Sequence, residues 1–131
     1  MKREIRFRGK ATVNGDWVHG YLWLNRRGQH FIDDANGKGY EVDPETVGQF
    51  TGLKDKNGKE IFEGDIVKYS YISPLDNKRK SRQWVVEYET GMYWLRDINK
   101  MSQYDSSLFL KFTRIEVIGN IYENHEILVQ E

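Results

Sequence analysis

Residues 43–69, DPETVGQFTGLKDKNGKEIFEGDIVKY, combine turn signals and apolar residues more densely than any other segment of the chain. Asn57-Gly58 predicts a hairpin with a type I′ turn, which needs positive φ at both central residues. Glu63-Gly64-Asp65 predicts a second tight reversal, and residues 66–69 have the β-branched and aromatic side chains of a strand. We therefore expect this stretch to form the hairpin and corner of a small β-structure.

The segment before it predicts a β-meander. Residues 4–13 alternate, with Ile5 and Phe7 on one side and charged side chains on the other. Asn14-Gly15 predicts a two-residue hairpin turn. A return strand, a turn, a third strand and a loop follow at residues 16–24, 25–28, 29–33 and 34–39.

The segment after it predicts further short strands. Asp43 before Pro44 predicts the N-cap of a single helical turn, because Gly48 follows too soon for a longer helix. Residues 73–81 are polar and charged and predict a mobile loop. We also expect a hairpin of residues 84–88 and 92–96 around Glu89-Thr90-Gly91, a short helix within residues 102–110 capped by Ser102, a strand at residues 114–122 and an apolar tail at residues 127–129.

About five short strands thus lie between Leu53 and Tyr122, and closing them into a barrel would remove exposed edges. We predict a mainly β fold in which an SH3-like small β-barrel (residues 43–131) has an N-terminal β-meander (residues 1–42) packed against it. The two would form one shared compact unit with at most one or two short helical turns.

Composition limits the class of protein. The 131 residues suffice for one core, and 38% hydrophobic with 14% aromatic residues predict a folded chain. The formal net charge is zero, so no global field attracts nucleic acid or an anionic membrane. There is no cysteine, no signal-peptide pattern at Met1-Lys2-Arg3-Glu4, and no apolar run near the ~20 residues that span a bilayer. We expect a cytoplasmic protein without a membrane partner.

Several blocks of sequence carry a resemblance to a known family. They are Arg3-Glu4-Ile5-Arg6-Phe7-Arg8-Gly9-Lys10, Asp43-Pro44-Glu45-Thr46-Val47-Gly48-Gln49-Phe50-Thr51-Gly52-Leu53, Asp55, Asn57-Gly58-Lys59-Glu60-Ile61, Glu63-Gly64-Asp65-Ile66-Val67 and Val117-Ile118-Gly119-Asn120-Ile121-Tyr122-Glu123-Asn124. On these residues the chain resembles the YopX family of bacteriophages and prophages. The resemblance covers nearly the whole chain, but nothing is carried over for about residues 70–112. It implies a mostly β fold and a phage-associated origin, and it supplies no catalytic or binding residue.

The histidines do not predict a catalytic or metal centre. His19, His30 and His125 are far apart and lack ligand spacing. A weak metal site remains as an alternative if His19 and His30 meet across strands with Asp33 or Asp34. We expect no enzyme activity, no metal and no cofactor.

The acidic residues near the corner have two interpretations. Glu60, Glu63 and Asp65 lie close together, as paired catalytic carboxylates do. The structural interpretation is favoured, because an Asp after Gly64 in a tight turn can accept backbone N–H bonds. The residues expected to shape turns are Asn14, Gly15, Asn57, Gly58, Gly64 and Asp65.

Basic residues gather on a strand face, at a turn and in a loop. Small barrels with neighbouring aromatic rings can grip phosphates and stack bases, although charge runs more often solvate a surface. Because the total charge balances, nucleic-acid binding is the alternative hypothesis. Its candidate residues are Arg6, Arg8, Lys10, Arg26, Arg27, Lys78, Arg79, Lys80 and Arg82.

The predicted strand at residues 16–24 has an aromatic face, formed by Trp17, His19, Tyr21 and Trp23. This face has three interpretations: core, subunit interface, or platform for bases or sugars. Both faces of the strand are apolar, so we favour core on one side and self-association on the other. The leading hypothesis is a non-catalytic, phage-encoded binding protein of the host cytoplasm, which forms a homo-oligomer or binds a host or phage protein.

Overall fold

The computed structural model describes residues 4–99 and 105–128, with only the backbone of residues 127 and 128. The chain divides into two compact units, Met1–Gly52 and Leu53–Glu131. The sequence-based division lies earlier, after residue 42. The difference arises in strand β5 (Gly48–Lys54), because its first residues pair with the first strand of the first unit. Each unit is described by itself.

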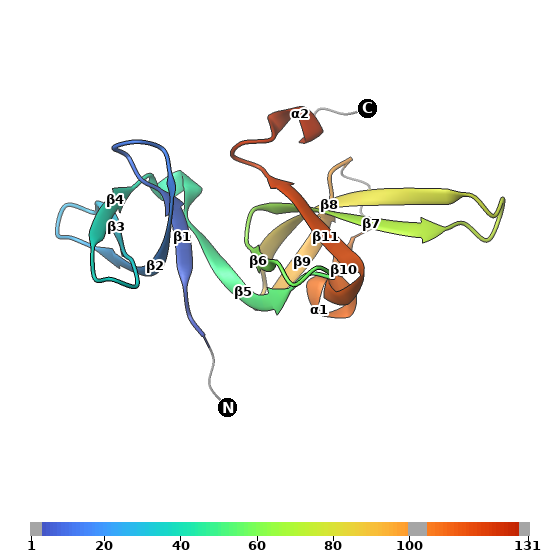
Figure 1. Cartoon of the computed structure of the whole chain (residues 1–131), viewed down its shortest axis with the longest axis horizontal. Helices are drawn as coiled ribbons and strands as arrows, with labels where there is room; N and C mark the ends of the chain where they lie inside the picture. Colours follow the sequence, from blue (N-terminus) through green and yellow to red (C-terminus); the bar gives the residue numbers. More distant parts are fainter. Residues whose placement is uncertain (1–3, 100–104, 129–131) are drawn as a thin grey trace. The chain divides into compact units, whose positions relative to one another are not determined.

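The first unit is an antiparallel meander, as the sequence predicts (Figure 1). Its sheet runs in the order β4-β3-β2-β1-β5. Ile5 precedes the first strand and is 52% exposed, so only Phe7 of the expected apolar pair packs against the core. The strands are β1 (Phe7–Lys10), β2 (Trp17–Leu24), β3 (His30–Asp33) and β4 (Gly39–Val42).

Strand β4 is an element that the sequence analysis missed. The predicted loop shortens to a turn, in which the Asp34 side chain accepts the N–H groups of Asn36 and Lys38. The end of β4 returns to the end of β1 through an isolated bridge between Ala11 and Val42. The meander therefore curls on itself around a core of buried side chains: Ala11, Val18, Ile32 and Val42.

Gly20 lets β2 change partners midway. Residues 17–20 of β2 pair with β1, and residues 21–24 pair with β3. A Cβ atom at Gly20 would lie 1.8 Å from the backbone oxygen of Asp33, so a side chain does not fit there without a backbone shift. This close approach explains why a glycine stands where β2 changes partners.

The single helical turn is confirmed as the 3₁₀ helix η1 (Pro44–Thr46). The Asp43 side chain accepts the N–H of Glu45 at 3.1 Å, as expected of an N-cap. Thr46 is buried, and its hydroxyl oxygen accepts the N–H of Lys10 at 2.9 Å. The turn is thereby tied to β1.

The second unit contains a five-stranded antiparallel sheet in the order β10-β9-β8-β7-β11. A further strand, β6 (Glu60–Phe62), neighbours β5. The five strands are β7 (Asp65–Ile72), β8 (Arg79–Glu89), β9 (Met92–Asp97), β10 (Ser106–Ser107) and β11 (Ile115–Asn120). The mainly β class is confirmed. The SH3-like barrel is not, because no pairing in the described part of the chain closes this sheet.

The core of the second unit uses one face of this sheet. Trp84 and Val86 of β8 are buried, together with Val67 of β7, Leu95 of β9 and Ile115 of β11. Ile61 of β6 and Leu108 complete the buried cluster. Residues far apart in sequence therefore share one apolar interior.

Two predicted two-residue turns differ from expectation. The turn at Asn14-Gly15 belongs to a longer loop at residues 12–15, because the N–H of Ala11 donates to the backbone oxygen of Asp16. At residues 55–58 only Gly58 has positive φ (81°), so the type I′ turn predicted for Asn57-Gly58 is wrong. A side chain decides this turn: Asp55 Oδ1 accepts the N–H groups of Asn57 and Lys59. Positive φ at two successive residues occurs instead at Thr90 (53°) and Gly91 (83°), in the β8–β9 turn.

Helical content exceeds the expected one or two turns, although each segment is short. Besides η1, the structure has α1 (Leu108–Lys111), η3 (Phe112–Arg114) and α2 (His125–Leu128). The predicted cap Ser102 and Val129 of the predicted tail lie outside the described residues. No described helix has the length and apolarity needed to cross a bilayer.

Candidate interaction surface

The outer face of the first unit brings basic and aromatic side chains together. In an antiparallel pair, directly opposite residues share a face of the sheet. The register sets Arg8 opposite His19 and Lys10 opposite Trp17. The aromatic residues of β2 are therefore on the same face as the basic residues of β1. We call Trp17, His19, Tyr21 and Trp23 the aromatic row.

At one end of the aromatic row, the rings are covered by cations. The guanidinium carbon of Arg8 lies 4.6 Å from the centre of the Trp17 ring, and Lys10 Nζ lies 5.5 Å from it. Arg6 is likewise 4.7 Å from the ring of Phe50. Arg8 is only 8% exposed, so this end of the row is a packed cation–π layer.

The other end of the row faces solvent. Tyr21 is 73% exposed and Trp23 is 44% exposed. The Trp23 ring stacks on Phe31 at 4.5 Å, and its Nε1–H donates to Asp33 Oδ1 at 2.9 Å. The opposite face of β2 supplies Val18 to the core. The aromatic face is thus the outer face, and Trp23 is held in one orientation.

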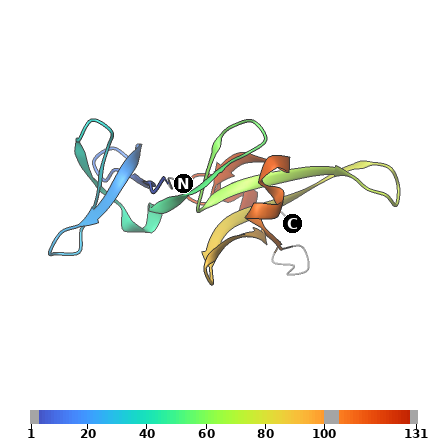
Figure 2. The same cartoon turned by 90° about the horizontal axis from the view of Figure 1, so that it is seen from below.

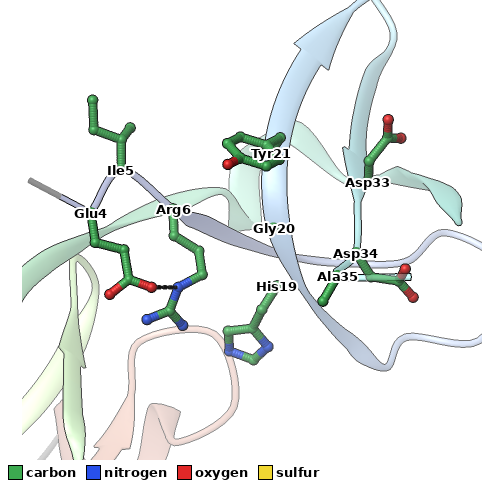
Figure 3. A pocket seen from close by; sticks show the side chains of 9 residues that line it. All are labelled: Glu4, Ile5, Arg6, His19, Gly20, Tyr21, Asp33, Asp34 and Ala35. Atoms are coloured by element: carbon green, nitrogen blue, oxygen red, sulfur yellow. Dashed lines mark hydrogen bonds and ion pairs between the residues drawn. The ribbon is translucent and has the colours of Figure 1, made fainter. Parts of the chain in front are cut away.

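An open pocket of about 590 Å³ lies beside Tyr21 (Figure 3). Arg6 and His19 contribute cationic or titratable groups, and Asp33 and Asp34 contribute carboxylates. Arg6 Nε pairs with Glu4 Oε1 at 3.0 Å, shown as the dashed line in Figure 3. The pocket is therefore lined by charged residues of both signs beside an exposed ring.

The metal site considered from the sequence does not assemble. Over residues 4–99 and 105–128, no group of three His, Asp or Glu side chains is arranged to hold an ion. His19 lines the pocket with Asp33 and Asp34, but His30 is opposite Leu24, the last residue of β2. His30 of β3 thus lies beside the end of β2, whereas His19 lies in the first half of β2, so the two histidines are not opposite each other.

The nine basic candidates do not all belong to one unit. Arg26 and Arg27 follow β2, whereas Lys10 is opposite the first residue of β2, so these positions lie at different ends of the strand. Four of the nine belong to the second unit: Lys78, Arg79, Lys80 and Arg82. The loop predicted there for residues 73–81 is shorter than expected, because β8 already begins at Arg79.

The acidic corner has the geometry of the structural interpretation. Asp65 is 2% exposed, and its Oδ2 accepts the N–H of Phe62 at 2.8 Å. The N–H of Gly64 donates to the backbone oxygen of Val86, and the oxygen of Gly64 accepts from Ile121. This corner therefore links three segments of the second unit.

Asp55 is a buried acid whose main role the sequence analysis missed. It is 6% exposed, and while its Oδ1 holds the turn after β5, its Oδ2 accepts the N–H of Val117 at 2.8 Å. The local signal was available, because an Asp two residues before Asn57-Gly58 is typical of an Asx turn. The bond to β11 spans residues distant in sequence and gave no local signal.

Arg96 of β9 is the centre of an ion-pair group that no motif indicated. Its Nη1 lies 2.9 Å from Asp105 Oδ2 and its Nη2 lies 2.6 Å from Glu89 Oε2. Hydrogen bonds to Asp105, and then to Glu89, raise the pKa of the guanidinium above its ordinary value. The side chain is held as a cation that braces the β8–β9 hairpin.

Comparison with known proteins supports a family assignment. No curated protein matches the chain. The crystal structure of protein EF1440 from Enterococcus faecalis is similar, with a TM-score of 0.59 and 25% identity over 97% of this chain and 99% of that chain. The family model for the YopX protein matches residues 7–129, which include every block of the resemblance except the first four residues of the block at residues 3–10. The chain therefore belongs to the YopX family.

Proposed function

We propose that this protein is a non-catalytic interaction module that associates with a second copy of itself through the solvent-facing end of the aromatic row. The observation that carries the proposal is the exposure of Tyr21 and Trp23 side by side on one outer face. Tyr and Trp are the side chains most enriched among residues that dominate binding energy.

Preorganisation supports this role. Trp23 is fixed by its stack on Phe31 and by its hydrogen bond to Asp33, so little side-chain entropy remains to be lost on association. Exposed Ile5, which lines the same pocket as Tyr21, extends the apolar area. Polar groups such as Asp33 and Asp34 border the pocket beside Tyr21 and fit the polar rim of an interface.

A base-stacking platform is less well supported at this face. The ring of Trp17 is already covered by Arg8 and Lys10, and Arg8 is buried. These cations therefore serve the packing of β1 on β2 before they can serve a phosphate. The family resemblance supports a phage-associated origin and, with it, a role in the cytoplasm of a bacterial host.

The test is the molar mass in solution, measured by light scattering over the micromolar concentration range. We expect a concentration-dependent rise toward a dimer or larger oligomer. Tyr21→Glu should abolish this rise, because a charge would have to be desolvated at the contact. The control Phe109→Ala removes an equally exposed ring (72%) from the second unit and should leave the rise unchanged. A strict monomer at every concentration would contradict self-association. Binding of a different protein to this surface, with the chain itself monomeric, would show that the partner is not a second copy.

A further inference from the structure

The β7–β8 hairpin extends beyond the rest of its sheet. β11 pairs with β7 only as far as Tyr69, and β9 pairs with β8 from Trp84 onward. The pairs Ser70–Ser81, Tyr71–Lys80 and Ile72–Arg79 lie past both neighbours, so within the described residues this part is two-stranded. Figures 1 and 2 both show the hairpin projecting from the second unit. We call residues 70–82 the ribbon.

The ribbon has a strongly one-sided charge although the whole chain is neutral. It contains four basic residues and a single acid, Asp76, which forms an ion pair with Lys80 at 3.2 Å. Residues 78–81 are exposed. The exposed apolar residues Ile72 (51%) and Leu75 (94%) lie near its tip. The basic residues are Lys78, Arg79, Lys80 and Arg82.

A column of aromatic rings connects this charge to the core. Trp84 is 2% exposed, Tyr69 stacks on it at 5.8 Å, and Tyr71 stacks on Tyr69 at 5.6 Å. The guanidinium of Arg82 lies 5.6 Å from the centre of the Tyr71 ring, and Lys111 Nζ lies 4.9 Å from that of Tyr69. The rings therefore hold cations in place along one face of the hairpin.

We propose that the ribbon binds double-stranded DNA, with its basic side chains on the phosphates and its two strands entering the major groove. That groove is about 12 Å wide and admits a two-stranded β-ribbon. Charge complementarity supplies the affinity, because each neutralised phosphate releases condensed counterions. This proposal does not depend on self-association through the aromatic row.

Other nucleic acids fit the ribbon less well. Single strands are bound by stacking bases on accessible rings, but Tyr69 and Tyr71 stack on each other and are covered by Lys111 and Arg82. The major groove of duplex RNA is deep and too narrow for side chains to read. Duplex DNA is therefore the expected ligand, and the other two are comparison ligands in the test.

The test is fluorescence anisotropy of a labelled DNA duplex titrated with the full chain. For about four phosphate contacts we expect affinity to fall by roughly 10² between 50 and 200 mM salt. The triple variant Lys78→Gln, Arg79→Gln, Arg82→Gln should reduce the slope of log affinity against log salt by about three. Ser81→Glu, which keeps every basic side chain, should weaken binding through repulsion of phosphate.

The matched control removes the same number of charges from exposed positions that are not candidate binding residues: Lys54→Gln, Lys56→Gln, Lys59→Gln. It should bind duplex DNA as the unmodified chain does. Circular dichroism checks that each variant is folded. If the triple variant is unfolded, the DNA affinity of Ser81→Glu tests the proposal in its place. Binding absent at low salt, binding equally weakened by the control, or tighter binding to single-stranded DNA or duplex RNA would each overturn the proposal.

Discussion

The aromatic row of the first unit and the ribbon of the second unit both combine aromatic rings with basic side chains, but with opposite exposure. In the row, Arg8 is buried against Trp17 while Tyr21 is 73% exposed. In the ribbon, the stacked rings end on buried Trp84, whereas residues 78–81 are exposed. A solvent-facing ring is suited to an apolar partner, whereas a solvent-facing cation is suited to a phosphate. Composition alone does not distinguish the two surfaces.

The largest expected effect separates a core ring from a surface ring. Trp84→Ala should lower the free energy of unfolding by about 3–5 kcal/mol, because it empties the centre of the second core. Trp23→Ala should lower it by only about 1 kcal/mol, because the ring is partly exposed and loses one stack and one hydrogen bond. Denaturant unfolding of both variants measures the difference. Equal losses of unfolding free energy in the two variants would contradict the distinction between a buried ring and a surface ring.

An intermediate effect concerns the acids that hold turns in the two units. Asp55→Ala should cost about 1–3 kcal/mol, because it leaves the buried N–H of Val117 without its acceptor. Asp43→Ala in the first unit should cost about 1 kcal/mol, as expected for loss of an exposed N-cap. Thermal unfolding of the two variants tests this order. A larger loss at Asp43 would show that the local cap outweighs the long-range bond.

The smallest effect is expected at Arg96, which lies opposite Val85 and thus on the other face of the sheet from Trp84. Arg96→Gln should shift Tm by no more than a neutral surface substitution does, because exposed ion pairs gain little over hydration. The raised pKa means that the folded state favours the charged form, so this contribution is fully present below the unfolded pKa and is lost only as pH rises through the folded one. Stability curves across about pH 6–9 should therefore run parallel for Arg96→Gln and the unmodified chain. Diverging curves would assign the ion-pair group a larger role.

Local sequence predicted features that depend on neighbouring residues. The Asp43 cap, the Glu63-Gly64-Asp65 corner and the hairpin at Thr90-Gly91 are confirmed. The type I′ turn at Asn57-Gly58 was wrong because the Asp55 side chain competes for the same N–H groups. Strand β4 was missed although its pairing with β3 is a local hairpin; only its bridge to Ala11 comes from a residue distant in sequence.

The sequence by itself determined a mainly β chain of short antiparallel strands, because alternation and turn residues act within a few positions. It also identified the aromatic row and the basic residues as candidate binding residues. Only the tertiary structure decided which of these side chains are covered. Arg8 and Arg82 look alike in sequence, yet one is buried over Trp17 and the other lies over a ring of the ribbon, because strand register and sheet edges are set by contacts across the whole fold.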